Sequence, residues 1–423
     1  MEKEKKNIIA LCIFSYGIIA FWTVENFWIN LYWTRNVDPN VRYVGFMVAV
    51  SAIVGVFTHI IFGALSDSCK SKHGRRRPFI LFGSITGGFA MCLFPITRIF
   101  SVLLLAITYA IIMDALITFF GDTTTPTRMA FLADSTEIEQ RGRINALVGF
   151  CGGLGIFSVI ILSGYIFDIA GPDFVFYFSG VILIICGIVF FIISKDPPMK
   201  ETKTFRENLK ETFTLDSYRE NKSFYILLFF LFINSTGIQI VFPYLFIYIE
   251  SIFGLKGIEL ALLLGFFTLI GFLISIFVGI LLDKIGRKAV MLLVTSGGAA
   301  MAFIFAFLSP NLEYILILIF VFGGLMIACF SSIASTSETW MQDLAPEDRR
   351  GSLLGYRIAA LVIPHVPGAL IGGFLADFGP KPEGFIYSPI IFIVCGIVLF
   401  LSLPFLRNVE ETLKKENKIL RLD

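Results

Sequence analysis

The sequence from Gly63 to Pro78 reads Gly-Ala-Leu-Ser-Asp-Ser-Cys-Lys-Ser-Lys-His-Gly-Arg-Arg-Arg-Pro, and it lies between two long apolar segments. It is a short, strongly basic connection with one acid, Asp67, at the end of the segment before it. A shorter version recurs in the second half of the chain, from Gly279 to Lys288, as Gly-Ile-Leu-Leu-Asp-Lys-Ile-Gly-Arg-Lys. Two copies of one connection indicate a chain with two related halves.

The composition indicates a membrane protein. The chain has 423 residues, 56% of them hydrophobic and 16% charged, and its mean hydropathy is +0.82. Soluble domains carry about 25% charged residues, so this chain has more apolar surface than it could bury within itself. The sequence lacks a Gly-x-x-x-x-Gly-Lys phosphate-binding loop, which argues against an ATP-driven pump. Its seven scattered cysteines form no Cys-x-x-Cys pair, so we expect neither a metal site nor another cofactor.

Apolar segments of about 20 residues mark membrane-spanning helices, because a helix of that length crosses the hydrocarbon core of a bilayer. The hydropathy pattern predicts twelve such segments, and therefore an all-α membrane protein. The predicted spans are residues 8–32, 43–66, 78–97, 100–132, 144–167, 174–194, 223–250, 259–282, 289–308, 313–341, 352–377 and 385–406.

The basic residues predict the orientation of these spans. With the N-terminus placed in the cytoplasm, all but a handful of the 34 Lys and Arg residues fall on the cytoplasmic side. Cytoplasmic connections of membrane proteins carry an excess of Lys and Arg. We therefore expect a multi-pass protein of the cell membrane with both termini in the cytoplasm. The basic residues expected outside are Arg35, Arg42, Arg98, Lys256 and Lys381.

The two halves of the chain are related by a repeat. Asp134 recurs as Asp343, and Cys186-Gly-Ile-Val-Phe-Phe recurs at the same offset as Cys395-Gly-Ile-Val-Leu-Phe. Matches at one constant offset indicate an internal duplication of the kind found in transporters. The longest polar connection separates the halves. The predicted parts are an N-terminal six-helix half (1–194), a cytoplasmic central loop (195–222) and a C-terminal six-helix half (223–423).

The two Gly-x-x-x-Asp…Gly-Arg-(Arg/Lys) connections resemble the signature of the major facilitator superfamily of transporters. The spacing from Asp67 to Gly74, with three arginines and a proline after it, resembles the sucrose–proton and glycoside–pentoside–hexuronide:cation symporters. The stretch Pro126-Thr-Arg-Met-Ala-Phe-Leu-Ala-Asp134 is similar to Pro-x-Arg-Ala-Leu-Leu-Ala-Asp of the sucrose-type symporters, with one residue more. The resemblance implies twelve helices in two six-helix repeats, a substrate cavity between the repeats, and alternating access.

The same resemblance implies a cytoplasmic latch, in which a loop acid meets the positive N-terminal end of a helix of the other half. Exposed ion pairs contribute only ~0–1 kcal/mol each, but a few pairs that form in one state shift a conformational equilibrium. We also expect Glu338 to pair with Arg357. The residues assigned to gating are Asp67, Gly74, Arg75, Arg76, Arg77, Asp134, Arg141, Asp283, Gly286, Arg287, Lys288, Glu338, Asp343, Arg350 and Arg357.

Ionisable side chains inside a span cost ~2.5–3.5 kcal/mol each, so each one is a candidate functional residue. Glu25 lies in the outer half of the first span, and Trp28 and Tyr32 fall on its face of the helix. An acid among aromatic rings is typical of a sugar site, where rings stack on C–H faces and carboxylates bind hydroxyls. The alternative is that these aromatics form a belt at the outer membrane interface.

The fourth span carries a polar stripe formed by Asp114, Thr118, Asp122, Thr125 and Arg128. Their spacing keeps them on one face of a helix. Lipid cannot solvate such a stripe, so it is expected to face a cavity, and its first three members are candidate substrate ligands. For Asp122 the alternative is a helix-end position at the water boundary.

The seventh span offers Ser235, Gln239 and Tyr244 as further substrate ligands. Pro243 is expected to break this helix, and broken helices line transporter sites. The alternative for the serine is a hydrogen bond to its own helix. His365, in the eleventh span, is interpreted as a neutral hydrogen-bonding side chain.

A coupling group must be ionisable, inside the membrane and free of a permanent ion-pair partner. Glu25 and Asp114 meet these conditions, because neither has a basic residue within one helical turn in the sequence. Asp114 is favoured, since it is nearer the middle of its span and belongs to the polar stripe.

The sequence therefore predicts a secondary active transporter and not an enzyme, with proton-coupled symport of a sugar or glycoside as its function. Its expected partners are a small-molecule substrate, a coupling cation (H⁺ favoured) and the lipid bilayer, with no nucleic acid and a monomeric state. The alternatives are a proton-coupled antiporter or exporter of another metabolite or drug, and a nutrient sensor that does not transport.

Overall fold

The computed structural model describes residues 2–69, 71–136, 138–196, 221–309, 311–344, 357, 360–381 and 385–413, without the side chains of a few helical residues such as Asp67 and Arg141. This described part is helical and contains no strand, which confirms the predicted fold class. Twelve of its helical runs are long and apolar enough to cross a membrane. The predicted number of spans is therefore also confirmed.

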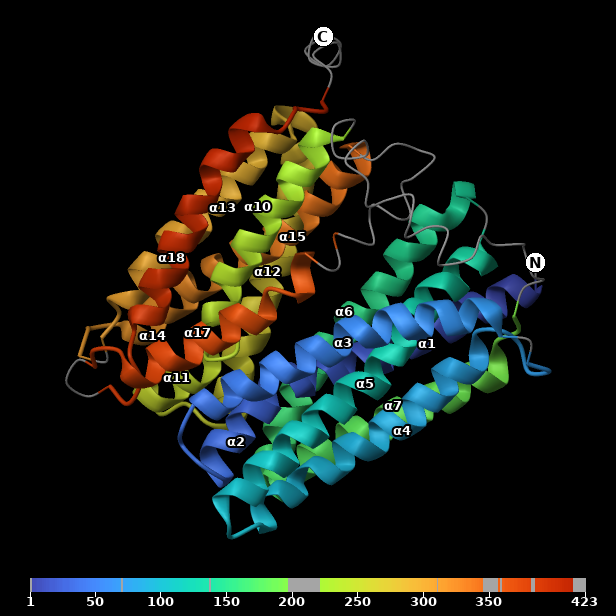
Figure 1. Cartoon of the computed structure of the whole chain (residues 1–423), viewed down its shortest axis with the longest axis horizontal. Coiled ribbons are helices and arrows are strands. Elements are labelled where there is room, and N and C mark those ends of the chain that lie inside the picture. Colours follow the sequence, from blue (N-terminus) through green and yellow to red (C-terminus); the bar gives the residue numbers. More distant parts are fainter. Residues whose placement is uncertain are drawn as a thin grey trace. The chain divides into compact units, whose positions relative to one another are not determined.

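The helices follow one another along the chain as Figure 1 shows. The first half contains α1 (Glu2–Val24), the π-helix η1 (Glu25–Ile29), α2 (Asn30–Asn36), α3 (Arg42–Ser68), α4 (Arg77–Leu93), the 3₁₀-helix η2 (Phe94–Ile99), α5 (Leu103–Ser135), α6 (Ile138–Ala170) and α7 (Pro172–Ile193). The second half contains α10 (Lys222–Val241), α11 (Leu245–Phe253), α12 (Gly257–Ile285), α13 (Arg287–Ala306), α14 (Ile315–Leu318), the π-helix η3 (Ile319–Gly323), α15 (Gly324–Leu344), α17 (His365–Phe378), α18 (Ile390–Ser402) and the 3₁₀-helix η4 (Leu403–Asn408).

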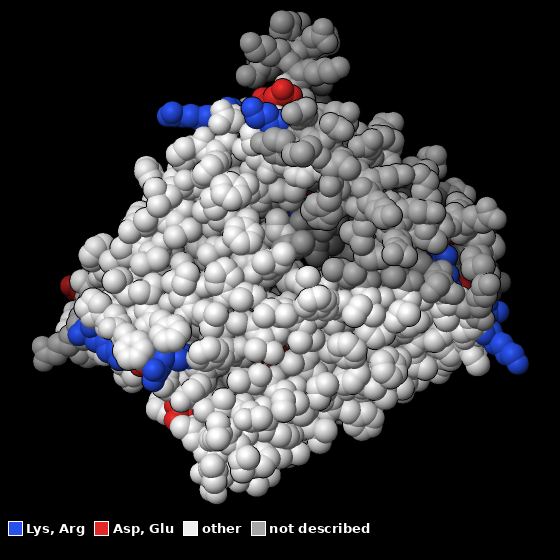
Figure 2. Space-filling view, in the orientation of Figure 1, with Lys and Arg blue, Asp and Glu red and all other residues white. Residues whose placement is uncertain are grey.

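The chain folds into two compact units. The first unit comprises Met1–Thr204 and Leu255–Leu262, and the second comprises Phe205–Gly254 and Leu263–Asp423. Apolar side chains also cover much of the described surface, and among the most exposed are Phe57 (61%) and Phe277 (63%). Figure 2 shows a face whose described centre is uncharged, with Lys, Arg, Asp and Glu at its margins. Such a surface suits contact with lipid.

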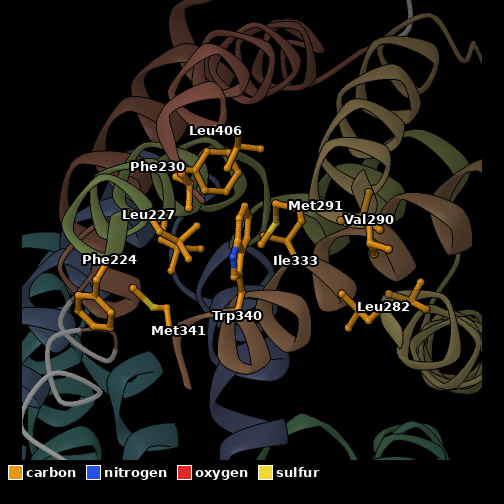
Figure 3. Close-up of a cluster of buried hydrophobic side chains, with 14 residues drawn as sticks. Phe224, Leu227, Phe230, Leu282, Val290, Met291, Ile333, Trp340, Met341 and Leu406 are labelled. Carbon is orange, nitrogen blue, oxygen red and sulfur yellow. The ribbon is translucent and has the colours of Figure 1, made fainter. Parts of the chain in front are cut away.

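The second unit has a dense apolar core, shown in Figure 3. Trp340 of α15 lies at its centre, between Leu227 and Phe230 of α10 on one side and Met291 of α13 on the other. The Trp340 side chain is fully buried, and its Nε1 donates a hydrogen bond to the carbonyl of Glu410 at 3.0 Å. A buried indole needs such an acceptor, so this bond joins the core of the second unit to the segment after η4.

The basic connections before α4 and α13 share two features, a glycine with a positive φ and an acid that binds the start of the helix. Gly74 and Gly286, just before α4 and α13, have φ values of +106° and +100°, which favour glycine. In the first unit, Asp196 accepts a hydrogen bond from the backbone N–H of Arg76 at 3.0 Å. In the second, Glu411 accepts hydrogen bonds from the backbone N–H groups of Arg287 (3.0 Å) and Lys288 (2.9 Å). An acid after α7 in the first unit, and one after η4 in the second, thus binds the otherwise unpaired N–H groups at a helix start.

Candidate substrate and coupling site

Three carboxylates and a histidine lie together inside the first unit, and we call them the acidic cluster: Glu25, His59, Asp114 and Asp122. Glu25 lies within electrostatic range of both aspartates. His59 Nε2 of α3 lies 3.0 Å from Asp122 Oδ1 of α5. The structure therefore brings together residues from α3, α5 and the start of η1, which are far apart in the sequence.

Asp114 is the most deeply buried acid of the acidic cluster, with 2% of the residue exposed. Ser51 of α3 donates a hydrogen bond to its carboxylate, and Ser51 also shares a hydrogen bond with Thr118. The other carboxylate oxygen, Oδ1, has no hydrogen-bond partner in the described part of the chain. A buried acceptor without a partner can take a proton or a hydroxyl group of a ligand.

Two departures from regular helix geometry coincide with the acidic cluster. The α1 run changes to a π-helix at Glu25, and π-helical turns are frequent at functional sites. In α5, Pro126 lacks the N–H group that would otherwise bond to the carbonyl of Asp122, one turn earlier. Both irregularities lie at acids of the acidic cluster, the first at Glu25 and the second one turn after Asp122.

Two glycines allow the helices around the acidic cluster to come close. A Cβ atom on Gly55 of α3 would lie 2.7 Å from Asp122 Oδ2. A Cβ atom on Gly121 of α5 would lie 2.8 Å from the ring of Trp22 and 2.9 Å from the ring of Phe21. The rings of α1 therefore lie directly on the backbone of α5, at the residue next to Asp122.

The polar stripe of α5 faces the interior of the first unit. Thr118 is 5% exposed, and Thr125 and Arg128 are partly buried. Apolar side chains of the same helix, such as Leu104 and Ile112, are more than half exposed. The stripe is thus directed away from the surface that lipid would cover.

Trp28 and Tyr32 hold one end of the first unit together. Trp28 Nε1 donates to Ser163 Oγ at 2.8 Å. The Tyr32 hydroxyl donates to the carbonyl of Pro95 at 2.9 Å and lies 3.0 Å from Asp173 Oδ1. Both side chains are almost fully buried, so their polar atoms stabilise the unit, and their predicted contact with substrate stays a prediction.

The seventh span is interrupted where the sequence predicts it. Its first part, α10, ends at Val241, and α11 begins at Leu245, so the predicted break at Pro243 is confirmed. Gln239 lies within hydrogen-bond distance of His365, with 2.9 Å between the two Nε2 atoms. Tyr244 donates a hydrogen bond to the carbonyl of Ala369, and Ser235 is 8% exposed. These residues form a second polar group, inside the second unit.

The predicted pair between Glu338 and Arg357 is present. Arg357 Nη2 lies 3.6 Å from Glu338 Oε2 and donates a hydrogen bond to the carbonyl of Ala334 at 2.9 Å. Glu338 is itself more than half exposed, so this pair is not enclosed in the protein.

Residues that the sequence predicts to act in gating form one ion-pair network in each unit. In the first, Asp134 Oδ2 lies 2.5 Å from Arg75 and 3.5 Å from Arg76. Arg77 donates hydrogen bonds to the carbonyls of His73 and Phe191. The side chains of Asp67 and Arg141 and all of Arg350 lie outside the described residues.

In the second unit, Arg287 lies 3.1 Å from Asp283 and 3.0 Å from Asp343. Lys288 donates hydrogen bonds to the carbonyls of Arg407 at 2.9 Å and Val409 at 3.1 Å. Asp343 therefore has the same kind of partner as Asp134, its counterpart in the repeat.

Sequence reasoning missed several residues of these sites. His59 and Ser51 lie on the face of α3 that meets α5, and only their occurrence as polar residues within an apolar span could have drawn attention to them. Asp196 and Glu411 lie a few residues after the final helix of each half. Each of these acids follows a predicted span by a few residues and is close to other polar residues, and this position was the only sequence signal for a role in binding a helix start.

The described chain thus combines twelve helices long and apolar enough to cross a membrane with buried acids in one unit and a broken helix in the other. Residues 10–360 match the sequence profile of the family described as Major Facilitator Superfamily, so the chain belongs to that family. It is therefore a multi-pass membrane protein of a transporter family, and not of an enzyme family.

The chain is similar to the quinolone resistance protein NorA of Staphylococcus aureus, with 31% identity over 158 residues. That match covers 37% of this chain and 39% of NorA, so less than half of the relative's length is spanned. It is also 33% identical over 127 residues to the uncharacterized MFS-type transporter MJ1317 of Methanocaldococcus jannaschii, covering 30% of each.

Solved structures share the fold at low sequence identity. A mutant of the nucleoside transporter NupG superposes with a TM-score of 0.77 at 12% identity, over 95% of this chain and 99% of that chain. The xylose transporter XylE from E. coli, in an inward open conformation, has a TM-score of 0.69 at 16% identity, over 99% and 98% of the two chains. These likenesses concern the fold.

Proposed function

We propose that this protein is a proton-coupled secondary active transporter that moves a sugar or glycoside by symport and alternating access. The observation that carries this proposal is the acidic cluster inside the first unit. Glu25 lies within electrostatic range of both Asp114 and Asp122, so acidic groups are held close together inside the unit. A membrane protein has few other reasons to keep acids away from water.

Asp114 is proposed as the coupling group, with Glu25 as its partner. The unpartnered Oδ1 of Asp114 is available to a proton, while Ser51 holds the carboxylate in place. Asp122 differs from both, because His59 Nε2 lies 3.0 Å from its Oδ1. A proton taken up at Asp114 would remove a charge that a buried site tolerates poorly.

A sugar is proposed as the substrate because carboxylates, hydroxyls and aromatic rings occur together. The partly exposed ring of Trp22 lies next to Gly121, the neighbour of Asp122, and a ring of this kind can stack on the C–H face of a sugar. The likeness of the Asp67–Pro78 connection to the sucrose and glycoside symporters supports the same choice. Ser235, Gln239 and Tyr244 of the second unit are proposed as further ligands.

The orientation and the gating roles are part of this proposal. Both termini are proposed to lie in the cytoplasm, so that the basic connections before α4 and α13 lie on the cytoplasmic side. The ion pairs of Arg75 and Arg287 with their aspartates are proposed to stabilise one access state over another. The transporter is proposed to work as a monomer.

The test is transport into proteoliposomes that contain the purified protein. Labelled sugars and glycosides are added with and without an acidic outside, and accumulation above the outside concentration is measured. Asp114→Asn is expected to abolish this uphill uptake while exchange at equal concentrations continues. Glu259→Gln, which changes an exposed acid at the start of α12, is the matched control and should accumulate substrate normally.

The proposal fails if Asp114→Asn and Glu25→Gln each still concentrate substrate under a pH gradient. A second candidate function is proton-coupled export of a drug, and the 31% identity to the quinolone resistance protein NorA favours it. In that case the same vesicles would show no sugar accumulation. They would instead move a quinolone against its gradient, in the direction opposite to the proton flux.

A further inference from the structure

An apolar groove of about 390 Å³ lies on the first unit between α4 and α7, and we call it the α4/α7 groove. One face of α4 forms most of it, since its α4 residues recur every three or four positions. Phe191 near the end of α7 and His73 of the basic connection complete it. The lining residues are His73, Pro78, Leu81, Phe82, Ile85, Thr86 and Phe191.

The lining of the α4/α7 groove suits a hydrocarbon chain and not a sugar. Phe82 lies in a membrane span and is 46% exposed, so its ring is accessible to lipid. The hydroxyl of Thr86 donates to the carbonyl of Phe82, its own helix, at 2.6 Å. The groove therefore presents hydrophobic side chains along the direction in which an acyl chain would lie.

Basic residues lie at the end of the α4/α7 groove nearest the basic connection, where Asp196 is within electrostatic range of Arg77. The Arg77 guanidinium lies 4.5 Å above the ring of Phe191, and the His73 ring is 6.0 Å from that same ring. Lys72, the residue before His73 in the chain, is exposed. Basic groups thus surround the mouth of an apolar groove, where a lipid headgroup would lie.

We propose that the α4/α7 groove binds an anionic phospholipid, with an acyl chain along α4 and the phosphate near Lys72 and His73. Charge complementarity selects an anionic headgroup, because basic groups near a membrane surface attract anionic lipids. Arg77 holds His73 and Phe191 in place and does not bind the phosphate, since its guanidinium already donates hydrogen bonds to the carbonyls of these two residues. The proposed orientation enters only in the choice of leaflet, which is the cytoplasmic one.

The test is lipid retention by the full-length chain in native mass spectrometry. The protein is titrated with phosphatidylglycerol or with phosphatidylcholine carrying identical acyl chains. We expect tighter binding of phosphatidylglycerol, weakened about fivefold by Lys72→Gln because one surface basic residue contributes about that factor. Lys284→Gln removes an exposed lysine at the end of α12, in the second unit, and should leave retention unchanged.

A second pair of variants tests the groove itself. Ile85→Trp fills it, whereas Phe89→Trp changes a 59% exposed residue one turn further along α4 that does not line it. We expect phosphatidylglycerol retention to fall in the first variant and to persist in the second. Equal binding of both lipids, or equal retention by the members of either pair, would overturn the proposal. Transport assays play no part, so this test can fail while the proposed function holds.

Discussion

Asp196 is a carboxylate whose position has a measurable thermodynamic consequence. It lies just after α7, outside the membrane span, and accepts the backbone N–H of Arg76. Burial raises the pKa of Asp196, while the hydrogen bond from Arg76 and the charge of Arg77 oppose that shift. The protonated form is therefore favoured more in the folded protein than in the unfolded chain.

A prediction about stability and pH follows from that direction. Stability contributed by a carboxyl group with a raised pKa is present at low pH and is lost as the pH rises through the folded-state pKa. Asp196→Asn keeps an acceptor oxygen and removes the titration. The apparent melting temperature of this variant, relative to that of the wild type, should therefore rise as the pH is raised from 4 to 8. Glu313→Gln, which changes an exposed acid outside the spans, is the control. A constant difference between Asp196→Asn and wild type at every pH would contradict the prediction.

At the scale of single residues, helical periodicity predicted some site members and not others. Asp114 and Thr118 could be assigned to one face because they belong to one helix. From α3, Ser51 donates a hydrogen bond to Asp114 and His59 lies beside Asp122. These contacts depend on how the two helices pack. Periodicity describes a helix by itself, so it does not reveal partners supplied by another helix.

At the scale of helices, Gly121 sets how closely α1 and α5 approach. Gly121→Ala would place a Cβ atom 2.8 Å from the Trp22 ring, so the ring or the helix must move. We expect a loss of about 1–3 kcal/mol in the free energy of unfolding, as for other overpacked cores.

The matched control for this prediction is Gly153→Ala in α6, where an added Cβ atom meets nothing within 4 Å. Alanine is the better helix former, so this variant should be stabilised by about 0.5–1 kcal/mol. Denaturation in detergent, followed by circular dichroism, measures both variants. Equal stability of the two would show that Gly121 does not set the spacing.

Breaks in helices were predictable where proline causes them. Pro243 lacks an N–H group and ends the regular hydrogen bonding of α10, as the sequence indicated. The π-helix at Glu25–Ile29 has no comparable signal, since its residues are ordinary helix formers or aromatics. A wider helical turn reflects how α1 fits against its neighbours, which a single sequence does not display.

At the scale of the molecule, the orientation in the membrane is the next prediction. A cysteine introduced into the 195–222 connection should resist a membrane-impermeant thiol reagent added to intact cells and react after the membrane is opened. The reason is that most Lys and Arg residues lie on the same side of the predicted spans as this connection, and connections rich in Lys and Arg stay in the cytoplasm. A cysteine at Glu313, in the connection before α14, is the control expected to react from outside. Reaction of the 195–222 site in intact cells would invert the proposed topology.

The fold of the whole molecule was more predictable than its substrate. Length, hydropathy and the two basic connections identify a family, because a bilayer permits few arrangements of twelve apolar helices. Substrate choice depends on a few side chains, such as Glu25 and Asp114, whose surroundings come from several helices. The same fold carries many substrates, so the resemblance to one branch remains a proposal.

Asp196 and Glu411 play corresponding parts in the two halves, so each basic connection is held by an acid of its own half of the chain. Each of these two acids belongs to the same half as the helix start whose N–H groups it binds. In genetic terms the coding sequence is divisible: a cut inside the 197–220 segment leaves both acids attached to the helices that they serve. Two plasmids, one for each fragment, should together restore transport in a host that lacks it, and either plasmid alone should not.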